Sequence, residues 1–557
     1  MKKTKNRIRL GNDGYFVRNG RRFVPAGVNY WPASCGVEMW QCWPDREIRH
    51  DLDVTARLGL NTVRFFLRWP DFEPQPGRYD VKQFKRLVQF ICWCRERGLL
   101  AQPSLLVGWM SGGTFYPEWK KARNLYTDPE MLKLVQAYYR HCAEVLSEHK
   151  DALLAVEFGN EMDVLADTGA VEPLRIVEWI RLMSRAIRSE YPDAIIVTGA
   201  DNSQVVTDCG WRLGQQPGTD CYTMHGYPVP AWQSVGFDGL TDPLAQSLLP
   251  FFVKSARAFG PVFLQEFGTV LTFGKKQQDS YLRGILPACW SAGANGFLWW
   301  CLRDINAKVY PYSQSQFEGT LGLVDSRDRV KPGLEYYLEF VKTLAKRPAA
   351  GYSITSESVG LYWPAGYYSR GNKDAALNDS RKLSRDMILA NYLLESCGFK
   401  VNIVRGDQPL KNVPKRILIT GAGLSEKEIR ALAAWVKNGG RLVWHGPDLS
   451  NCGHAMIDLL GARPVDFRVA RRVSAECFGV SWTFPSFPNN TRVEVEPYPA
   501  EVVSADSDGV PVLMKNTLSN GSIVWSQPSI EEAVLEVSGV PAEREKWRAW
   551  YQGILSA

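Results

Sequence analysis

Residues 153–161 read "LLAVEFGNE", an apolar run that ends in glycine and is followed directly by an amide, Asn160, and a carboxylate, Glu161. An apolar run without alternation is typical of a parallel strand that is buried on both faces. A helical pattern over residues 172–191 follows, and then a second apolar run over residues 194–199. The stretch therefore predicts a strand–helix–strand unit with two polar side chains at the exit of its first strand.

The same alternation extends from residue 24 to residue 347 on both sides of this stretch. Eight strands are predicted, over residues 24–30, 61–67, 99–106, 153–159, 194–199, 219–227, 261–268 and 295–300. The fold class is therefore α/β, and the natural closure is a (β/α)8 TIM barrel, whose functional residues lie at the C-terminal ends of the strands. The residues at those ends are Arg64, Glu161, His225, Glu266 and Trp299.

A second carboxylate occupies the same kind of position as Glu161. Residues 261–268, "PVFLQEFG", carry Glu266 near the end of an apolar run. Hydrolysis of a glycosidic bond uses two carboxyl groups, one to protonate the leaving oxygen and one to attack or stabilise the anomeric carbon. Either glutamate alone is explained equally well as a surface or capping carboxylate. Two of them, at the ends of the fourth and seventh strands, instead indicate a glycosidase site.

Short motifs at these strand ends resemble those of the clan A glycoside hydrolases: "GNE" after strand 4, "HGY" in strand 6, "QEFG" in strand 7 and "LWW" in strand 8. Within that clan, "FVPAGVNYW" and "NTVRFFLRW", which contains Arg64, most resemble glycoside hydrolase family 5. The resemblance covers residues 15–345. It implies that Glu161 is the general acid/base and Glu266 the nucleophile of a retaining double displacement. It also implies that Arg64 holds the nucleophile ionised and that Asn160 binds the sugar 2-hydroxyl.

The same resemblance implies a set of substrate-contacting side chains. Tyr227 would lie near the nucleophile and His225 near the acid/base, while Trp299 would be the platform beneath the sugar in subsite −1. Trp300 competes for the platform position, because strand periodicity turns only one of the two neighbours into the barrel. Further candidates are Trp31 and Trp109, which lie in segments punctuated by Gly and Pro. A packing role explains Trp109 nearly as well as a role in the pocket. The segment after strand 3, which contains Trp109, lacks the histidine that the family often has there.

The chain continues beyond the barrel, which we predict to span residues 1–347. A second α/β domain is predicted over residues 352–465 and a small β-rich domain with a C-terminal helix over residues 466–557. The α/β domain resembles the glutamine-amidotransferase-like module of family 42 β-galactosidases. Because "ILITGAGLS" (417–425) has no cysteine at its strand exit, we expect this module to be non-catalytic and to serve packing or homo-oligomer contacts.

The three-domain layout resembles bacterial exo-acting family 5 β-mannosidases, and the expected function is a retaining exo-β-mannosidase acting on short oligosaccharides. The Trp-rich loops at 32–47 and 111–129 are long enough to close a pocket. A β-galactosidase, a β-glucosidase, or an endo-acting mannanase or glucanase remain alternatives, because barrel strands do not specify the sugar. A non-catalytic carbohydrate-binding protein is a more distant one, since both carboxylates are present.

Composition limits the other classes of function. The net charge of +7 is spread along 557 residues without a basic stripe, so no nucleic-acid partner is expected. No apolar run is long enough for a membrane span, and the N-terminus lacks the apolar segment of a secretory signal. No ligand cluster or phosphate-binding loop predicts a metal or another cofactor. The twelve dispersed cysteines fit reduced thiols in a cytoplasmic protein.

Overall fold

The computed structural model describes residues 8–557, except 170, 229–238, 270–273, 349–353, 369–379, 422, 470–471, 486 and 489–490. The chain divides into two compact units. The first comprises Met1–Val205, Cys209–Pro228 and Ser255–Gly351, and the second comprises Val206–Asp208, Val229–Lys254 and Tyr352–Ala557.

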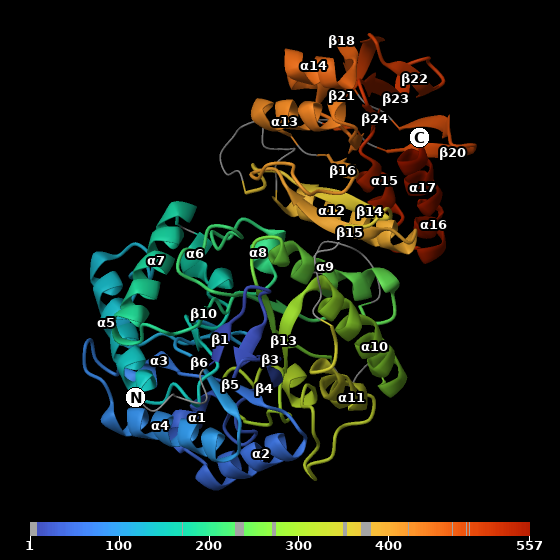
Figure 1. Ribbon diagram of the computed structural model, residues 1–557. Helices are drawn as coiled ribbons and strands as arrows, with labels where there is room; N and C mark the ends of the chain where they lie inside the picture. Colours follow the sequence, from blue (N-terminus) through green and yellow to red (C-terminus); the bar gives the residue numbers. More distant parts are fainter. Residues whose placement is uncertain are drawn as a thin grey trace. The chain divides into compact units, whose positions relative to one another are not determined.

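Eight parallel strands form a barrel in the first unit (Figure 1). Their order around the barrel is the order of the sequence, and a parallel bridge between Val197 and Cys221 closes the ring. The predicted (β/α)8 fold is therefore confirmed. The strands are β4 (Ala26–Tyr30), β5 (Thr62–Phe66), β6 (Leu100–Ser104), β9 (Val156–Glu157), β10 (Ile196–Val197), β11 (Tyr222–Gly226), β12 (Val262–Phe267) and β13 (Ala294–Trp299).

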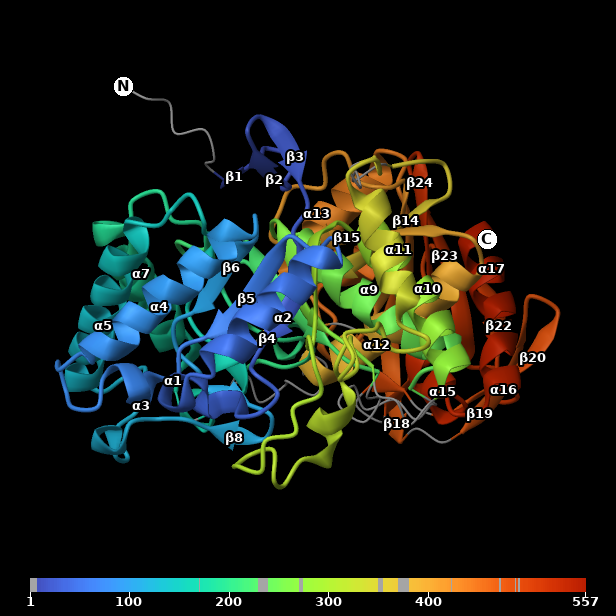
Figure 2. The ribbon, with the colours of Figure 1, turned by 90° about the horizontal axis from the view of Figure 1, so that it is seen from below.

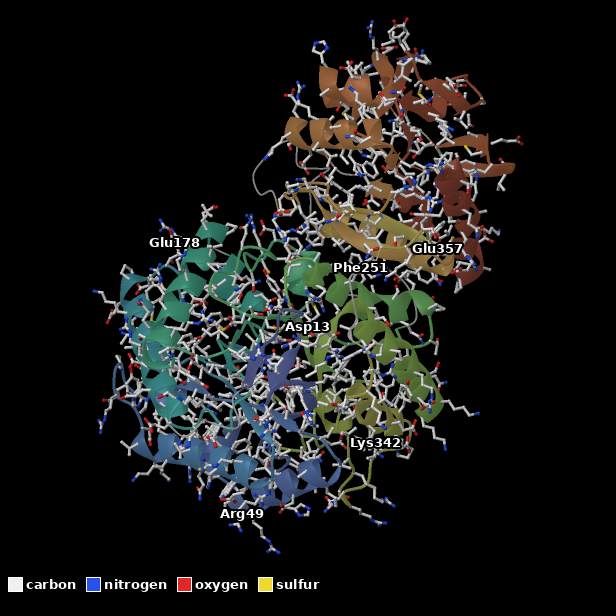
Figure 3. The ribbon with its side chains drawn as sticks, viewed as in Figure 1. Asp13, Arg49, Glu178, Phe251, Lys342 and Glu357 are labelled. Carbon is white, nitrogen blue, oxygen red and sulfur yellow. The ribbon has the colours of Figure 1, made fainter. Side chains whose placement is uncertain are left out.

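Amphipathic helices surround this barrel (Figures 1 and 2). Two of them begin at aspartates whose side chains accept backbone N–H groups of the first turn: Asp80 before α4 and Asp128 before α5. Charged residues such as Arg49 on α2 and Glu178 on α7 point outward (Figure 3). The main helices of this unit are α2 (Asp45–Arg57), α4 (Val81–Glu96), α5 (Pro129–Ser147), α7 (Pro173–Glu190), α10 (Lys275–Ala292) and α11 (Glu335–Leu344).

The N-terminal end of the barrel is filled by the start of the chain. Strands β1 (Ile8–Leu10), β2 (Phe16–Arg18) and β3 (Arg21–Phe23) form an antiparallel sheet. Its Ile8 and Phe16 pack with barrel residues into one buried cluster. Figure 2 shows this sheet and β8 (Gly113–Thr114), which follows the third barrel strand, at opposite ends of the barrel. The end left for a functional site is therefore the C-terminal one.

The second unit is built on a seven-stranded sheet in the order β15-β14-β16-β17-β24-β23-β22. The first five strands are parallel, and β23 and β22 extend the sheet in antiparallel fashion. Its strands are β14 (Ser358–Trp363), β15 (Lys400–Arg405), β16 (Arg416–Thr420), β17 (Arg441–His445), β22 (Glu501–Ala505), β23 (Pro511–Leu518) and β24 (Gly521–Ser526). The helices include α9 (Pro243–Arg257), most of which belongs to this unit, α12 (Ser380–Ser396), α13 (Glu426–Lys437), α14 (His454–Leu460), α15 (Ile530–Glu536), α16 (Pro541–Lys546) and α17 (Arg548–Ser556).

The sheet extends across residues 465 and 466, where we predicted a boundary between the α/β domain and a β-rich domain. Strand β24 lies beside β17 with Val443 opposite Val524, so the region predicted as a separate β-rich domain completes the sheet of the α/β domain. Smaller antiparallel pairs within it are β18 (Ala462–Val469) with β21 (Thr491–Pro497), and β19 (Val473–Cys477) with β20 (Val480–Phe484). The predicted C-terminal helix is present as α17.

Within the described part of the chain, no helix is both long and apolar enough to cross a membrane. All twelve cysteines are free thiols. Burial raises the pKa of the Cys397 thiol, which directly follows α12, and a raised pKa disfavours the thiolate that a nucleophile needs.

Candidate active site

Glu161 lies just beyond the fourth barrel strand in a backbone conformation that is uncommon for glutamate. Its φ of 48° and ψ of 48° are left-handed, and its N–H donates to the carbonyl of Gly199 at 2.7 Å. A side chain on Gly199 would collide with the backbone oxygen of Gly159, because a Cβ there would lie 2.0 Å from it. The tight crossing of these two strand exits therefore fixes where the Glu161 carboxylate lies. Strained backbone of this kind recurs at functional sites.

Glu266 lies within β12, next to β11, and pairs in register with His225. The pairing of β12 with both neighbours is irregular, with register shifts near Leu264 and at Met224/His225. A bulge of this kind re-aims side chains. As a result Gln265 and Glu266, although adjacent, both make contacts at the same site.

The two carboxylates and a histidine come together at the C-terminal end of the barrel. One oxygen of Glu161, one of Glu266 and a ring nitrogen of His225 all lie within 4.8 Å of one another. Nδ1 of His225 is 2.9 Å from Oε1 of Glu161 and 3.6 Å from Oε2 of Glu266. Retaining glycosidases have their carboxyl groups about 5–5.5 Å apart, whereas inverting ones need about 6.5–9.5 Å. The spacing here is that of the retaining class.

Glu161 has a pKa well above that of an ordinary glutamate. Burial raises its pKa to about 7, and the negative charge of Glu266 acts in the same direction. The hydrogen bond from His225 opposes both effects by stabilising the carboxylate. A carboxyl group with a pKa near neutrality is able both to give up and to take back a proton at that pH.

Arg64 is the cation at the centre of the site. It is fully buried, and its Nη1 donates to Oε2 of Glu266 at 2.9 Å. Its Nε and Nη2 each donate to one oxygen of Glu157 at 2.7 Å. Burial would raise the pKa of Glu157, but the charge and hydrogen bonds of Arg64 outweigh it and lower that pKa. One guanidinium thus compensates two buried carboxylates.

Asn160 and Tyr227 are oriented by the same array. Oδ1 of Asn160 accepts from Nη2 of Arg64 at 2.6 Å, and its Nδ2 donates to the carbonyl of Trp109 at 2.6 Å. This leaves one amide N–H available to a ligand. The hydroxyl of Tyr227 donates to Oε1 of Glu266 at 2.6 Å, so each oxygen of that carboxylate is bound.

Gln265 and Glu157 belong to a layer that sequence reasoning did not assign. Nε2 of Gln265 donates to Oε2 of Glu157 at 2.6 Å, and its Oε1 lies 3.1 Å from Nε2 of His225. Alternation along β9 is a signal that could have placed Glu157 in the barrel interior. It could not have placed Gln265 beside Glu266, because the irregular pairing of β12 brings both neighbours to the site.

The two adjacent tryptophans make different contacts, and the packing of Trp299 argues against the expectation that it is the sugar platform. Trp299 packs against Tyr337 of α11 at 5.8 Å between ring centroids, and its Nε1 donates to the carbonyl of Leu321 at 2.9 Å. It therefore lies between the barrel and the surrounding helices. Trp300 contacts Phe66 at 5.8 Å, and its Nε1 donates to Oε2 of Glu318 at 3.0 Å. Of the two side chains, that of Trp300 contacts the carboxylate of Glu318, whose pKa responds to the charge of Glu266.

Trp31 and Trp109 differ in what they contribute. Trp31 is buried and stacks on Phe66 at 5.3 Å, on the same ring that Trp300 contacts. Trp109 belongs to a small hairpin of β7 (Trp109–Met110) and β8, and its backbone carbonyl holds Asn160. Trp109 thus reaches the site through its main chain.

Glu318 was not predicted from the sequence. It lies in the 3-10 helix η6 (Gln316–Thr320), in the segment after the eighth strand. Burial and, to a smaller extent, the charge of Glu266 raise its pKa to about 7, so the two carboxylates lie in one electrostatic environment. An acidic residue in an aromatic-rich loop is the only sequence signal at this position.

Glu161, His225 and Glu266 also have the spacing of a metal site, but hydrogen bonds already engage them with one another, with Arg64 and with Tyr227. An opposed carboxyl pair with a buried arginine beneath one member is the arrangement of an acid/base and nucleophile pair. It can protonate a leaving oxygen from one side and attack carbon from the other.

Comparisons with known proteins agree with this arrangement. No family model matches the chain. An exo-β-1,4-mannosidase, Op5Man5, from Opitutaceae bacterium strain TAV5 is 47% identical over 98% of this chain and 99% of its own, with a TM-score of 0.94. A GH5_18 structure from Streptomyces cattleya shares the fold at 21% identity, covering 72% of this chain and 99% of its own, with a TM-score of 0.62. A variant of Gan42B, a family 42 β-galactosidase of G. stearothermophilus, does so at 14% identity, covering 96% and 88%, with a TM-score of 0.68.

Curated relatives match only in part. A β-galactosidase of Xanthomonas manihotis is 29% identical over 171 residues, which are 28% of this chain and 27% of that protein. β-Galactosidase 17 of Arabidopsis thaliana is 31% identical over 136 residues, which are 23% and 18% of the two chains. The matched segments thus span about a quarter or less of these relatives. On the strength of the near-complete match to Op5Man5, the chain belongs to glycoside hydrolase family 5 and carries a C-terminal region arranged like that of family 42.

Proposed function

We propose that this chain is a retaining exo-β-mannosidase that removes single mannose residues from the non-reducing ends of short β-1,4-linked oligosaccharides. The observation that carries the proposal is the opposed pair Glu161 and Glu266, with oxygens within 4.8 Å of each other. The similarity to an exo-β-1,4-mannosidase over almost the whole chain supports the choice of sugar and linkage.

In the first step Glu266 attacks the anomeric carbon while Glu161 gives its proton to the departing glycosidic oxygen. Arg64 and Tyr227 each bind one oxygen of Glu266, which holds the carboxylate in place for in-line attack. The free N–H of Asn160 would bind the 2-hydroxyl beside the reacting carbon. Bond breaking turns the Glu266 carboxylate into an ester, so the negative charge near Glu161 is lost and its carboxylate form is favoured.

In the second step Glu161, now a carboxylate, takes a proton from water, and the water oxygen attacks the anomeric carbon of the glycosyl ester. Glu266 leaves as a carboxylate and Glu161 is protonated again, so both residues return to their starting states. Two inversions at the same carbon give net retention.

Contacts among three loops support exo action. The segment after β13 touches the loop after β4, where the N–H of Asn306 donates to the carbonyl of Ala33 at 3.1 Å. It also touches the β7–β8 hairpin, where Tyr310 contacts Phe115 at 6.0 Å and the carbonyl of Gly112 at 3.4 Å. Loops that meet in this way wall off one side of the site, as a pocket for a chain end requires.

A screen of aryl β-glycosides tests the proposal. The 4-nitrophenyl β-mannoside and β-glucoside differ only at C2, and the β-glucoside and β-galactoside differ only at C4. We expect kcat/KM to be highest for the mannoside, with the β-anomer of mannose formed first when the reaction is followed by NMR. With β-1,4-mannotetraose, mannose and mannotriose should be the first products. Initial release of mannobiose would instead indicate endo action.

β-Galactosidase activity is the second candidate, because the partly matching curated relatives are β-galactosidases. The same screen decides, since it would then rank the galactoside first. Contact between subunits through the second unit and a cytoplasmic location remain predictions. The first is tested by light scattering of the whole chain and of a chain ending after α11.

A further inference from the structure

Glu318 is a buried carboxylate at the active site that the mechanism above does not use. Its side chain lies on the segment after the eighth strand, and the residue is 5% exposed. Its Oε2 accepts the Nε1–H of Trp300 at 3.0 Å. Among the described residues, no arginine, lysine or histidine forms an ion pair with it. A buried carboxylate without a cation is costly unless other groups satisfy it.

Two buried hydroxyl groups, those of Ser111 and Tyr312, lie in the same neighbourhood. Within the described part of the chain neither makes a well-aligned hydrogen bond, but Ser111 lies within hydrogen-bonding reach of Glu318 and of Tyr312 and lowers the pKa of both. Burial, together with the charge of Glu318, raises the pKa of Tyr312. Ser111 also has a left-handed φ of 53°, between the two strands of the β7–β8 hairpin. Buried hydroxyls without well-aligned hydrogen bonds, next to a carboxylate, form a set of groups suited to bind further hydroxyls.

Packing does not require a carboxylate here. The contact with Trp300 needs one acceptor oxygen, which the amide of a glutamine would supply equally well. The charge of Glu266 also raises the pKa of Glu318, so a carboxyl group at this position is disfavoured electrostatically as well. The carboxyl group of Glu318 is therefore better explained by ligand binding than by packing.

The barrel order indicates which part of the sugar Glu318 would meet. Glu161 and Asn160 follow the fourth strand, and the segment with Glu318 follows the eighth, which lies diametrically opposite in an eight-stranded ring. If the bond to be broken lies beside Glu161, the atoms directed toward the eighth strand are those across the ring from the anomeric carbon. Those atoms carry the 3- and 4-hydroxyls.

We propose that Glu318 is a specificity-determining residue whose carboxylate accepts a hydrogen bond from the 3- or 4-hydroxyl of the terminal sugar, with Ser111 and Tyr312 completing the binding site for this end of the ring. This proposal rests on the function proposed above and deepens it. The 4-hydroxyl of a β-1,4-linked chain is free only at the non-reducing end. A carboxylate that accepts from it selects chain ends over internal residues.

The experiment compares the full-length wild type with the Glu318→Gln and Glu318→Ala variants on 4-nitrophenyl β-mannoside and its 2-, 3-, 4- and 6-deoxy analogues. Loss of a hydrogen bond to a charged group should lower kcat/KM for the parent mannoside about 10- to 100-fold in Glu318→Gln. On the 3- or the 4-deoxy substrate, which lacks the hydroxyl, wild type and variant should agree within about twofold, because the contact is already absent.

An equal loss on all five substrates would overturn the proposal, since Glu318 would then act only through Trp300 or the fold. The proposal would also be overturned if wild type and variant agreed only on the 2- or the 6-deoxy substrate. The exposed Glu339 on α11 provides the matched control, and Glu339→Gln should leave all ratios unchanged. If Glu318→Ala does not fold, the near-isosteric Glu318→Gln variant decides alone. If the wild type prefers another glycoside, the proposed function fails, and the deoxy series of that glycoside still tests Glu318.

Discussion

The guanidinium of Arg64 donates to Glu266 at 2.9 Å and to both oxygens of Glu157 at 2.7 Å. The nucleophile candidate therefore depends on a cation that a second, fully buried carboxylate already holds in place. Glu157 fixes the plane of the guanidinium, and the remaining N–H groups are thereby aimed at Glu266 and Asn160. This arrangement preorganises the charge of the nucleophile before the substrate binds.

Replacement of Arg64 by lysine should therefore lower both the stability of the protein and its kcat/KM. An ammonium group cannot reproduce the planar fork that bonds Glu157 and Glu266 together, so at least one buried carboxylate loses its partner. Breaking a buried ion pair in this way costs about 3–5 kcal/mol of folding free energy. Chemical denaturation measures that loss. A variant with wild-type stability and kcat/KM would contradict the role assigned to Arg64.

The two glutamates should differ in their response to azide. Glu161→Ala and Glu266→Ala should each lower the hydrolysis of aryl β-mannosides by several orders of magnitude. In Glu161→Ala the nucleophile remains, so azide can attack the glycosyl ester and yield the β-azide by a second inversion. In Glu266→Ala no ester forms, and no β-azide should appear. Product analysis by NMR separates the two roles, and full activity of either variant would exclude its assignment.

The rate should fall as the pH rises through about 7, because Glu161, whose pKa is raised to that value by burial and by Glu266, must be protonated to assist the leaving group. The hydrogen bond from His225 lowers this pKa, so His225→Phe should move the alkaline limb of the kcat/KM profile to higher pH. Initial rates at low substrate concentration, measured at a series of fixed pH values, give the shift. A limb that stays in place, or moves to lower pH, would argue against Glu161 as the group that titrates.

The sequence was sufficient where function and local pattern coincide. Glu161 and Glu266 stand at the ends of apolar runs, so their placement at one end of the barrel followed from the alternation of strands and helices. Glu318 could not be placed in this way, because it lies 18 residues beyond Trp300 in a loop whose path depends on contacts with other loops. The boundary at residue 465 failed for a related reason. The pairing of β24 with β17 joins segments far apart in the chain, and no local signal records such pairing.

Trp299 and Trp300 provide a test in which each residue is the control for the other. Trp300→Phe removes the indole N–H that binds Glu318 and shortens the aromatic surface on the site. It should lower kcat/KM about 10- to 100-fold, as expected for a lost hydrogen bond to a charged group. Trp299→Phe removes the hydrogen bond to Leu321 and opens a cavity against Tyr337, so it should lower the melting temperature by several degrees and leave kcat/KM near that of the wild type. Activity lost in Trp299→Phe and retained in Trp300→Phe would show instead that Trp299 is the sugar platform.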